Sequence, residues 1–194
     1  MSKTVFREHL GVYEHILTFE EFTRLTDEDV LGPFAGRVEL FDGGIYELAP
    51  VSAAHGNAAT SSFSKLLSWL RLLENGSLTV VADTTLLLSD TNAAQPDLMV
   101  VRRREEGYYQ ASDCEFLIEI RVSMQKHDFE RKPLFYAEAG VPEYWAIDVE
   151  RRLVRMHRRP SLSGYQDVRD VTDEGAVIGP LFAPEARVRL ADLL

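Results

Sequence analysis

The spacing of apolar positions along the chain alternates between a helical period and a strand period. Helical spacing from about residue 55 to residue 74, ended by Asn75-Gly76, predicts a long helix. Its apolar positions are Phe63, Leu66, Leu67, Leu70 and Leu73. A second helix is expected from about residue 128 to residue 139, where Gly140 ends it.

Two local signals organise the N-terminal part of the chain. Thr18-Phe19-Glu20-Glu21 has the Thr-x-x-Glu form of a capping box, so a short helix is expected to begin there. Asp42-Gly43 lies between two strand-like runs, at residues 37–41 and 44–48. Because Asp-Gly between such runs is a strong hairpin signal, these runs are predicted to pair as an antiparallel hairpin.

The remaining strand-like runs set the expected fold class. They lie at residues 78–81, 85–88, 98–101, 116–122, 143–148 and 153–157, with a last short run at 187–190. The order of elements lacks strict alternation of strand and helix. It therefore predicts an α/β fold, a mixed β-sheet flanked by helices, with extra strands from the N-terminal hairpin.

Composition limits the class of protein without naming it. A chain of 194 residues without repeats or a clear linker fits a single domain, residues 1–194. The lone cysteine, Cys114, can form neither an intramolecular disulfide nor a thiolate zinc site, which favours a reducing compartment. No apolar run approaches the roughly 20 residues that span a bilayer, and residues 1–11 are too polar for a secretory signal. We therefore expect a cytoplasmic protein with no membrane partner.

Charge argues against a protein that coats nucleic acid non-specifically. The net charge is −10, whereas such proteins carry a positive surface. Arginines nevertheless gather at residues 102–104 and again at residues 151–159. Either cluster can contact phosphates, or it can be ordinary solvated surface charge. The chain has no Gly-rich phosphate loop and no Gly-x-Ser-x-Gly elbow, so no nucleotide cofactor is expected.

Two acidic residues on neighbouring strand-like runs carry the candidate chemistry. Asp97 follows Pro96 at the start of one run, and Glu119 lies inside the next, 22 residues later. Two such carboxylates can hold a hard divalent cation, which activates water and offsets charge on a phosphate. Strand alternation puts Glu119 and Arg121 on one face and Ile120 on the other. In the alternative interpretation that face is partly solvated and Glu119 pairs with Arg121 or another neighbour.

Four segments also carry a resemblance to a known family. They are Gln95-Pro96-Asp97, Phe116-Leu117-Ile118-Glu119-Ile120, Asp128-Phe129-Glu130-Arg131-Lys132 and Tyr136-Ala137-Glu138-Ala139-Gly140-Val141-Pro142-Glu143-Tyr144-Trp145-Ala146-Ile147-Asp148. They resemble the Uma family, a group assigned as endonucleases within the PD-(D/E)XK, or restriction-endonuclease-like, superfamily. The resemblance covers roughly residues 15–160, a nuclease-like core, and leaves 161–194 as a C-terminal extension. It implies a central four-stranded mixed sheet with a helix on each face, and Mg²⁺ or Mn²⁺ as the metal.

The resemblance also assigns roles residue by residue. It makes Asp97, Glu119 and the main-chain carbonyl of Ile120 metal ligands, and Glu39 reaches the metal directly or through water. Arg121 occupies the lysine position of the (D/E)xK element. Arginine stays protonated and cannot act as a general base, although it can clamp a phosphate or stabilise developing charge.

Three further side chains complete the candidate site. Lys132 is the other candidate for the lysine role, and because Pro133 directly follows it, it is expected in or near the first helical turn. In the alternative interpretation, favoured without the resemblance, it is a surface lysine paired with Asp128. His55, at a helix start, can position a water or contact phosphate, or be merely structural. Tyr136 lies one helical turn beyond Lys132 and is expected to line the same substrate-binding edge.

Together these observations predict an endonuclease that hydrolyses DNA phosphodiester bonds with metal-activated water. Arg121 and the acidic charge keep an alternative open, a catalytically degenerate nuclease fold that binds nucleic acid or a protein partner. A homodimer is compatible with cutting both strands, but no sequence feature specifies it. The sequence does not distinguish DNA from RNA, and it shows no DNA-reading module.

Overall fold

The computed structural model describes residues 5–9, 12–27, 30, 38–73, 76–122 and 128–194. It contains two compact units, one formed by Met1–Pro50 with Thr85–Gln95 and the other by Val51–Thr84 with Pro96–Leu194. No described helix is both long enough and apolar enough to cross a membrane. The single domain expected over residues 1–194 stays a prediction, and each unit is taken by itself below.

The first unit is built from short strands and one helix. Its elements are β1 (Val5–His9), β2 (Val12–Ile16), α1 (Phe19–Asp27), β3 (Val38–Phe41), β4 (Gly44–Glu47), β6 (Leu86–Ser89) and β7 (Asn92–Ala94). Strands β1 and β2 pair antiparallel, and β4, β3, β7 and β6 pair in that order. A small core of Phe22, Val38, Leu40 and Ala93 lies in this unit.

Both local signals of the N-terminal part are confirmed. Thr18 N–H donates to Glu21 Oε2 at 2.9 Å and Glu21 N–H donates to Thr18 Oγ1 at 3.3 Å, the reciprocal pair of a capping box. Strands β3 and β4 form the predicted hairpin, with positive φ at Asp42 (50°) and Gly43 (71°) as a type I′ turn requires. A Cβ on Gly43 would lie 2.1 Å from Ile16 Cγ2, so only glycine fits there.

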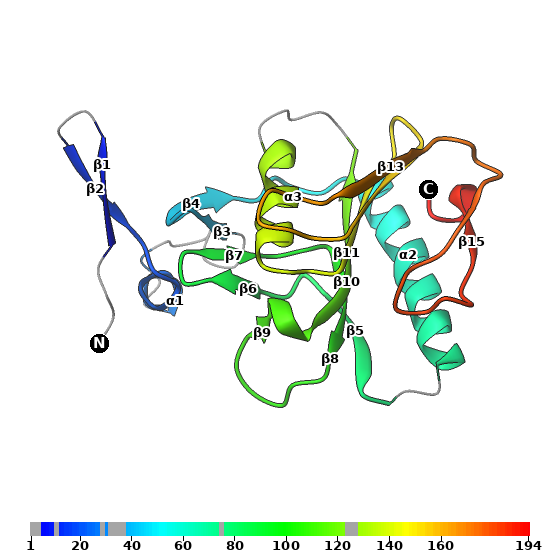
Figure 1. Ribbon diagram of the computed structural model, residues 1–194, viewed down its shortest axis with the longest axis horizontal. Helices are drawn as coiled ribbons and strands as arrows, with labels where there is room; N and C mark the ends of the chain where they lie inside the picture. The colour runs from blue at the N-terminus through cyan, green and yellow to red at the C-terminus, as the bar shows by residue number, and fades with distance from the viewer. Residues whose placement is uncertain (1–4, 10–11, 28–29, 31–37, 74–75, 123–127) are drawn as a thin grey trace. The chain divides into compact units, whose positions relative to one another are not determined.

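The second unit contains a six-stranded mixed sheet in the order β13-β12-β11-β10-β8-β5 (Figure 1). The strands are β5 (Leu78–Ala82), β8 (Leu98–Arg102), β10 (Cys114–Arg121), β11 (Glu143–Asp148), β12 (Leu153–Arg158) and β13 (Asp167–Val171). Strands β10 and β11 run parallel, and the other neighbours run antiparallel. The smaller elements are β9 (Tyr109–Gln110), η2 (Ala111–Asp113), β14 (Val177–Ile178), β15 (Val188–Arg189) and η3 (Leu190–Asp192).

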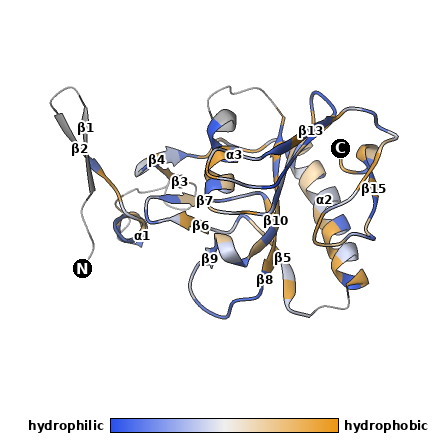
Figure 2. Cartoon of the chain, viewed as in Figure 1, coloured by the Kyte–Doolittle hydropathy of each residue, from blue (hydrophilic) through white to orange (hydrophobic). Residues whose placement is uncertain are grey.

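Helices α2 (Ala53–Leu72) and α3 (Asp128–Glu138) lie on opposite sides of this sheet (Figure 1). The mixed sheet with flanking helices predicted from the sequence is therefore confirmed. Beneath α2 the sheet is apolar: Phe116 and Trp145 meet edge to face at 5.0 Å between ring centroids, and Trp69 of α2 packs on Trp145. Figure 2 shows apolar residues recurring along α2 and the central strands.

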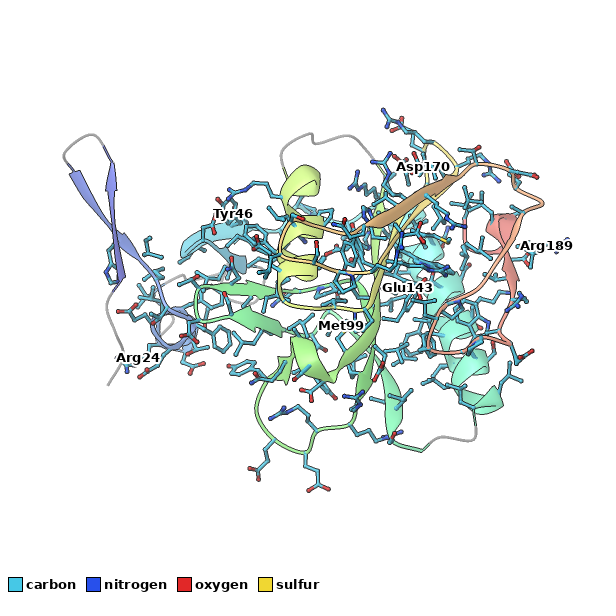
Figure 3. The ribbon with its side chains drawn as sticks, viewed as in Figure 1. Arg24, Tyr46, Met99, Glu143, Asp170 and Arg189 are labelled. Atoms are coloured by element: carbon cyan, nitrogen blue, oxygen red, sulfur yellow. The ribbon has the colours of Figure 1, made fainter. Side chains whose placement is uncertain are left out.

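The C-terminal residues are part of this core. Ala183, Val188, Leu190 and Leu193 are buried in the same cluster as Phe116 and Trp145. Glu143, which is fully buried and labelled in Figure 3, ties them to the sheet. Its carboxylate accepts hydrogen bonds from Arg158 Nε, Trp145 Nε1 and Leu181 N. Residues 161–194 thus complete the core of the unit that carries the candidate site.

Candidate active site

Asp97 directly precedes β8 and Glu119 lies on the neighbouring strand β10, so the two are brought together as the sequence predicts. Strand β8 pairs antiparallel with β10, and Leu98, directly after Asp97, stands opposite Ile118, directly before Glu119. Asp97 Oδ2 accepts a hydrogen bond from Ile120 N at 2.6 Å. Asp97 is therefore fixed to the backbone of the residue that follows Glu119.

His55 lies against Asp97 at the start of α2. Ser52 caps this helix and accepts from His55 N at 3.3 Å, and His55 Nε2 lies 3.2 Å from Asp97 Oδ1. The hydrogen bond to Asp97 raises the pKa of His55, burial opposes that shift, and the charge of Asp97 and the backbone carbonyl of Ile120 add to the rise. His55 thus contacts two of the groups that the sequence proposes as metal ligands.

Glu119 is buried at the centre of a second group of polar side chains. Its Oε1 accepts from Lys132 Nζ at 3.1 Å and from Tyr136 Oη at 2.5 Å. Only 6% of Glu119 and 8% of Lys132 is exposed, so Glu119 itself is not solvated, although it does pair with a neighbouring charge as the alternative interpretation expects. The surface-lysine interpretation of Lys132 is wrong, because its described partner is Glu119; the Asp128 side chain lies outside the described residues.

Helix α3 positions both donors to Glu119. Lys132 and Tyr136 are four residues apart and so share one helix face, which is turned toward β10. Helix α3 begins at Asp128, so Lys132 directly follows its first turn, close to the expected place, and Pro133 lies inside the helix. Tyr136 is fully buried and its hydroxyl bonds the Glu119 carboxylate, and its expected place at a substrate-binding edge stays a prediction.

Arg121 stands on the same face of β10, two residues beyond Glu119. It is half-buried, and burial lowers its pKa to about 10, against the opposing charges of Tyr144, Asp148 and Glu119. At neutral pH it remains a cation, which excludes it as a general base. Its position is compatible with holding a phosphate.

Glu39 belongs to the first unit. It is buried there, and its Oε1 accepts from Gln95 N at 2.8 Å. Its predicted contact with a metal at Asp97 and Glu119 stays a prediction. Gln95, which bonds Glu39, is separated from Asp97 only by Pro96 in the sequence.

Sequence reasoning missed Asp83, which directly follows β5. Its N–H donates to Asp97 O at 3.4 Å, its φ is 46°, and its charge contributes to the raised pKa of His55. The signal was hidden because Asp83 is 14 residues before Asp97 in sequence and meets it only through the antiparallel pairing of β5 with β8.

Comparison with known proteins decides the family. The family model Uma2, described as "Putative restriction endonuclease", matches residues 19–191. The chain belongs to the Uma2 family. A solved structure, a "putative nuclease belonging to DUF820" from Anabaena variabilis ATCC 29413, matches with a TM-score of 0.68 at 19% identity. The match covers 87% of this chain and 96% of that one, and it shows a shared fold. Among the curated proteins compared, none matches.

The Uma2 match extends beyond the range expected from the motifs. The resemblance was expected over roughly residues 15–160, whereas the family model continues to residue 191. This agrees with the buried positions of Leu190 and its neighbours in the core. The segment that follows residue 160 is therefore a regular part of the Uma2 fold.

Both arginine clusters of this Uma2 chain are largely neutralised by neighbouring acids. Arg155 forms a two-pronged pair with Asp170 of β13, at 2.6 and 2.7 Å (Asp170 is labelled in Figure 3). The other described ion pairs of the clusters are Arg102–Glu115, Arg104–Asp113, Arg151–Asp148, Arg152–Glu174 and Arg158–Glu143. The structure therefore favours the interpretation of these clusters as paired surface charge.

The donor set around Asp97 and Glu119 fits a hard divalent cation. Two carboxylates on adjacent strands and the carbonyl of Ile120 are all oxygen donors, the kind Mg²⁺ prefers. Within the described residues no three His, Cys, Asp or Glu side chains gather as a metal-binding group. That is compatible with Mg²⁺, which often takes only one or two carboxylates and keeps several waters.

Proposed function

We propose that this Uma2-family protein is a metal-dependent endonuclease that hydrolyses phosphodiester bonds of DNA. The proposal is supported above all by one observation: Asp97, directly before β8, lies beside Glu119 of β10, and the ammonium of Lys132 lies on Glu119. An acid pair with a buried lysine is the set of groups that phosphodiester hydrolysis by activated water needs.

Each residue of the site has a separate task in this proposal. Asp97 and Glu119, with the Ile120 carbonyl, hold Mg²⁺ or Mn²⁺, which when bound lowers the pKa of a water and offsets phosphate charge. Lys132 Nζ and Tyr136 Oη orient the Glu119 carboxylate, and Lys132 adds positive charge beside the phosphate that is attacked. His55 orients Asp97 through its 3.2 Å contact. Arg121 holds a non-bridging phosphate oxygen.

A cleavage assay with near-isosteric variants tests this function. Supercoiled plasmid and single-stranded DNA are incubated with Mg²⁺, Mn²⁺ or EDTA and the wild type, Asp97→Asn or Glu119→Gln. Glu115→Gln is the matched control, because Glu115 lies on the same strand as Glu119 but pairs with exposed Arg102. We expect metal-dependent cleavage by the wild type and the control only. Cleavage retained in both site variants would refute the assignment of these acids.

The second candidate is a non-catalytic nuclease fold that binds nucleic acid or a protein partner. Arg121 at the lysine position and the net charge of −10 favour it. Titration with Mn²⁺ separates the two candidates. A folded wild type that binds Mn²⁺, with binding weakened in Asp97→Asn, supports the nuclease; a folded wild type that binds none supports the second candidate.

A further inference from the structure

Tyr144 of β11 has a buried hydroxyl that the candidate site does not yet explain. The residue is fully buried, and its Oη has no hydrogen-bond partner among the described residues. The two other tyrosines near it are satisfied: Tyr136 donates to Glu119 and Tyr165 donates to the carbonyl of Val141. Buried tyrosine hydroxyls normally find a partner, so the exception calls for a physical reason.

The position of Tyr144 points to the site. Strand register places it opposite Leu117, on the face of the sheet that carries Glu119 and Arg121. Its ring contacts Tyr136 edge to face at 5.3 Å and stacks on His157 at 4.8 Å. Tyr144 thus packs directly against Tyr136, whose hydroxyl donates to the Glu119 carboxylate.

Tyr144 stays protonated, so its hydroxyl is available as a hydrogen-bond donor. Burial, with the charge of Glu119 adding to it, raises the pKa of Tyr144 well above its ordinary value, while Arg121 and Lys132 oppose the shift. The neutral hydroxyl therefore carries a proton that needs an acceptor. Arg121 and Lys132 offer no acceptor, whereas an ionised carboxylate has about four lone-pair sites.

We propose that Tyr144 is a positioning residue of this site, and that its hydroxyl donates to a water molecule which in turn donates to the carboxylate of Glu119. The inference rests on the proposed function of Glu119 as a metal ligand. A bridging water links the two because no direct bond joins them in the described structure, and such a bridge is nearly as favourable as a direct bond. Together with Lys132 and Tyr136 it helps to fix the Glu119 carboxylate.

Tyr144→Phe removes the hydroxyl and keeps both ring contacts. Outer-shell partners of metal ligands typically contribute 10–100-fold to affinity, so we expect Mn²⁺ binding, measured by calorimetry on the folded protein, to weaken about tenfold. Tyr165→Phe is the matched control. It also removes a tyrosine hydroxyl next to the Tyr144 ring, but this hydroxyl donates to the carbonyl of Val141. It is expected to leave Mn²⁺ affinity unchanged.

A crystal structure of the wild type gives a second, metal-independent readout. It should show a water oxygen about 2.5–3.0 Å from Tyr144 Oη and within hydrogen-bond distance of Glu119. Unchanged Mn²⁺ affinity in Tyr144→Phe, or a dry hydroxyl in that structure, overturns the inference. If the wild type binds no Mn²⁺, the proposed function fails on its own, and the presence or absence of the water still decides the role of Tyr144.

Discussion

Breaking the Lys132–Glu119 pair from one side is expected to be costly, and neutralising it from both sides is expected to be cheap. The two charged groups are 3.1 Å apart, with only 10% and 8% of their side chains exposed. Removing one partner of such a pair leaves an uncompensated buried charge, at a cost of about 3–5 kcal/mol. We therefore expect Lys132→Met to lose about 3–5 kcal/mol of unfolding free energy.

The double variant Lys132→Met/Glu119→Gln should recover most of that loss. Both side chains are then neutral and close to their original volume, and the amide oxygen of the new glutamine can still accept from Tyr136. Replacing a buried pair by neutral groups of similar size is often nearly free, so we expect a coupling energy of about 2–4 kcal/mol. Glu115→Gln, which breaks an exposed pair with Arg102, should cost at most about 1 kcal/mol.

Tryptophan fluorescence during urea unfolding is the assay suited to this cycle. The chain has two tryptophans, Trp69 and Trp145, and both lie in the core of the unit that carries the pair. The signal therefore reports on that unit. Two results would refute a buried, coupled pair. One is a loss of less than about 1 kcal/mol of unfolding free energy in Lys132→Met; the other is a double variant whose loss equals the sum of the losses in Lys132→Met and Glu119→Gln.

Three further predictions follow from buried or paired groups. Burial lowers the pKa of His157 to about 4 from an ordinary value of 6.5, so as the pH falls the unfolded chain takes up a proton on this imidazole before the folded chain does. The neutral His157 therefore costs no stability above about pH 6.5, and the unfolding free energy falls by about 3 kcal/mol as the pH drops to 4 and below. His157→Phe should remove that part of the acid sensitivity in the same fluorescence assay, and an unchanged pH profile would contradict it. Leu190→Ala, at a fully buried position, should cost about 2–5 kcal/mol, whereas a cost near zero would place the C-terminal residues outside the core. Because the arginine clusters are neutralised, log Kd for DNA should change with log salt by less than about 3, and a slope of 5 or more would show an extended phosphate interface.

Much of the fold follows from local sequence signals, and the exceptions have physical causes. The Asp42-Gly43 hairpin and the Thr18 capping box are decided by backbone conformation and hydrogen bonds within a few residues. Strand β13, by contrast, was not predicted. Three of the five residues of Asp167–Val171 are charged and neither face of the strand is apolar, so it forms a strand because β12 offers it an edge for pairing.

The candidate site was predictable in outline but not in depth. A Pro-Asp before one strand and a Glu inside the next sufficed to place Asp97 beside Glu119. The burial of Lys132 and Tyr136 could not be read from the sequence, since their spacing shows that they share a helix face but not what that face covers. Tyr144 was hidden for a similar reason, because only the packing shows that its buried hydroxyl has no partner among the described residues.

The excursion of the chain between β5 and β8 bears on how such proteins can diverge. Ala82 and Leu98 are paired neighbours in the sheet, so the segment between them leaves and returns at nearly the same point while contributing β6 and β7 to the other unit. The ends of this segment are held together by the pairing of β5 with β8, independently of the residues in between. Substitutions in β6 and β7 can therefore remodel the first unit while β8 and β10 keep the register that brings Asp97 to Glu119.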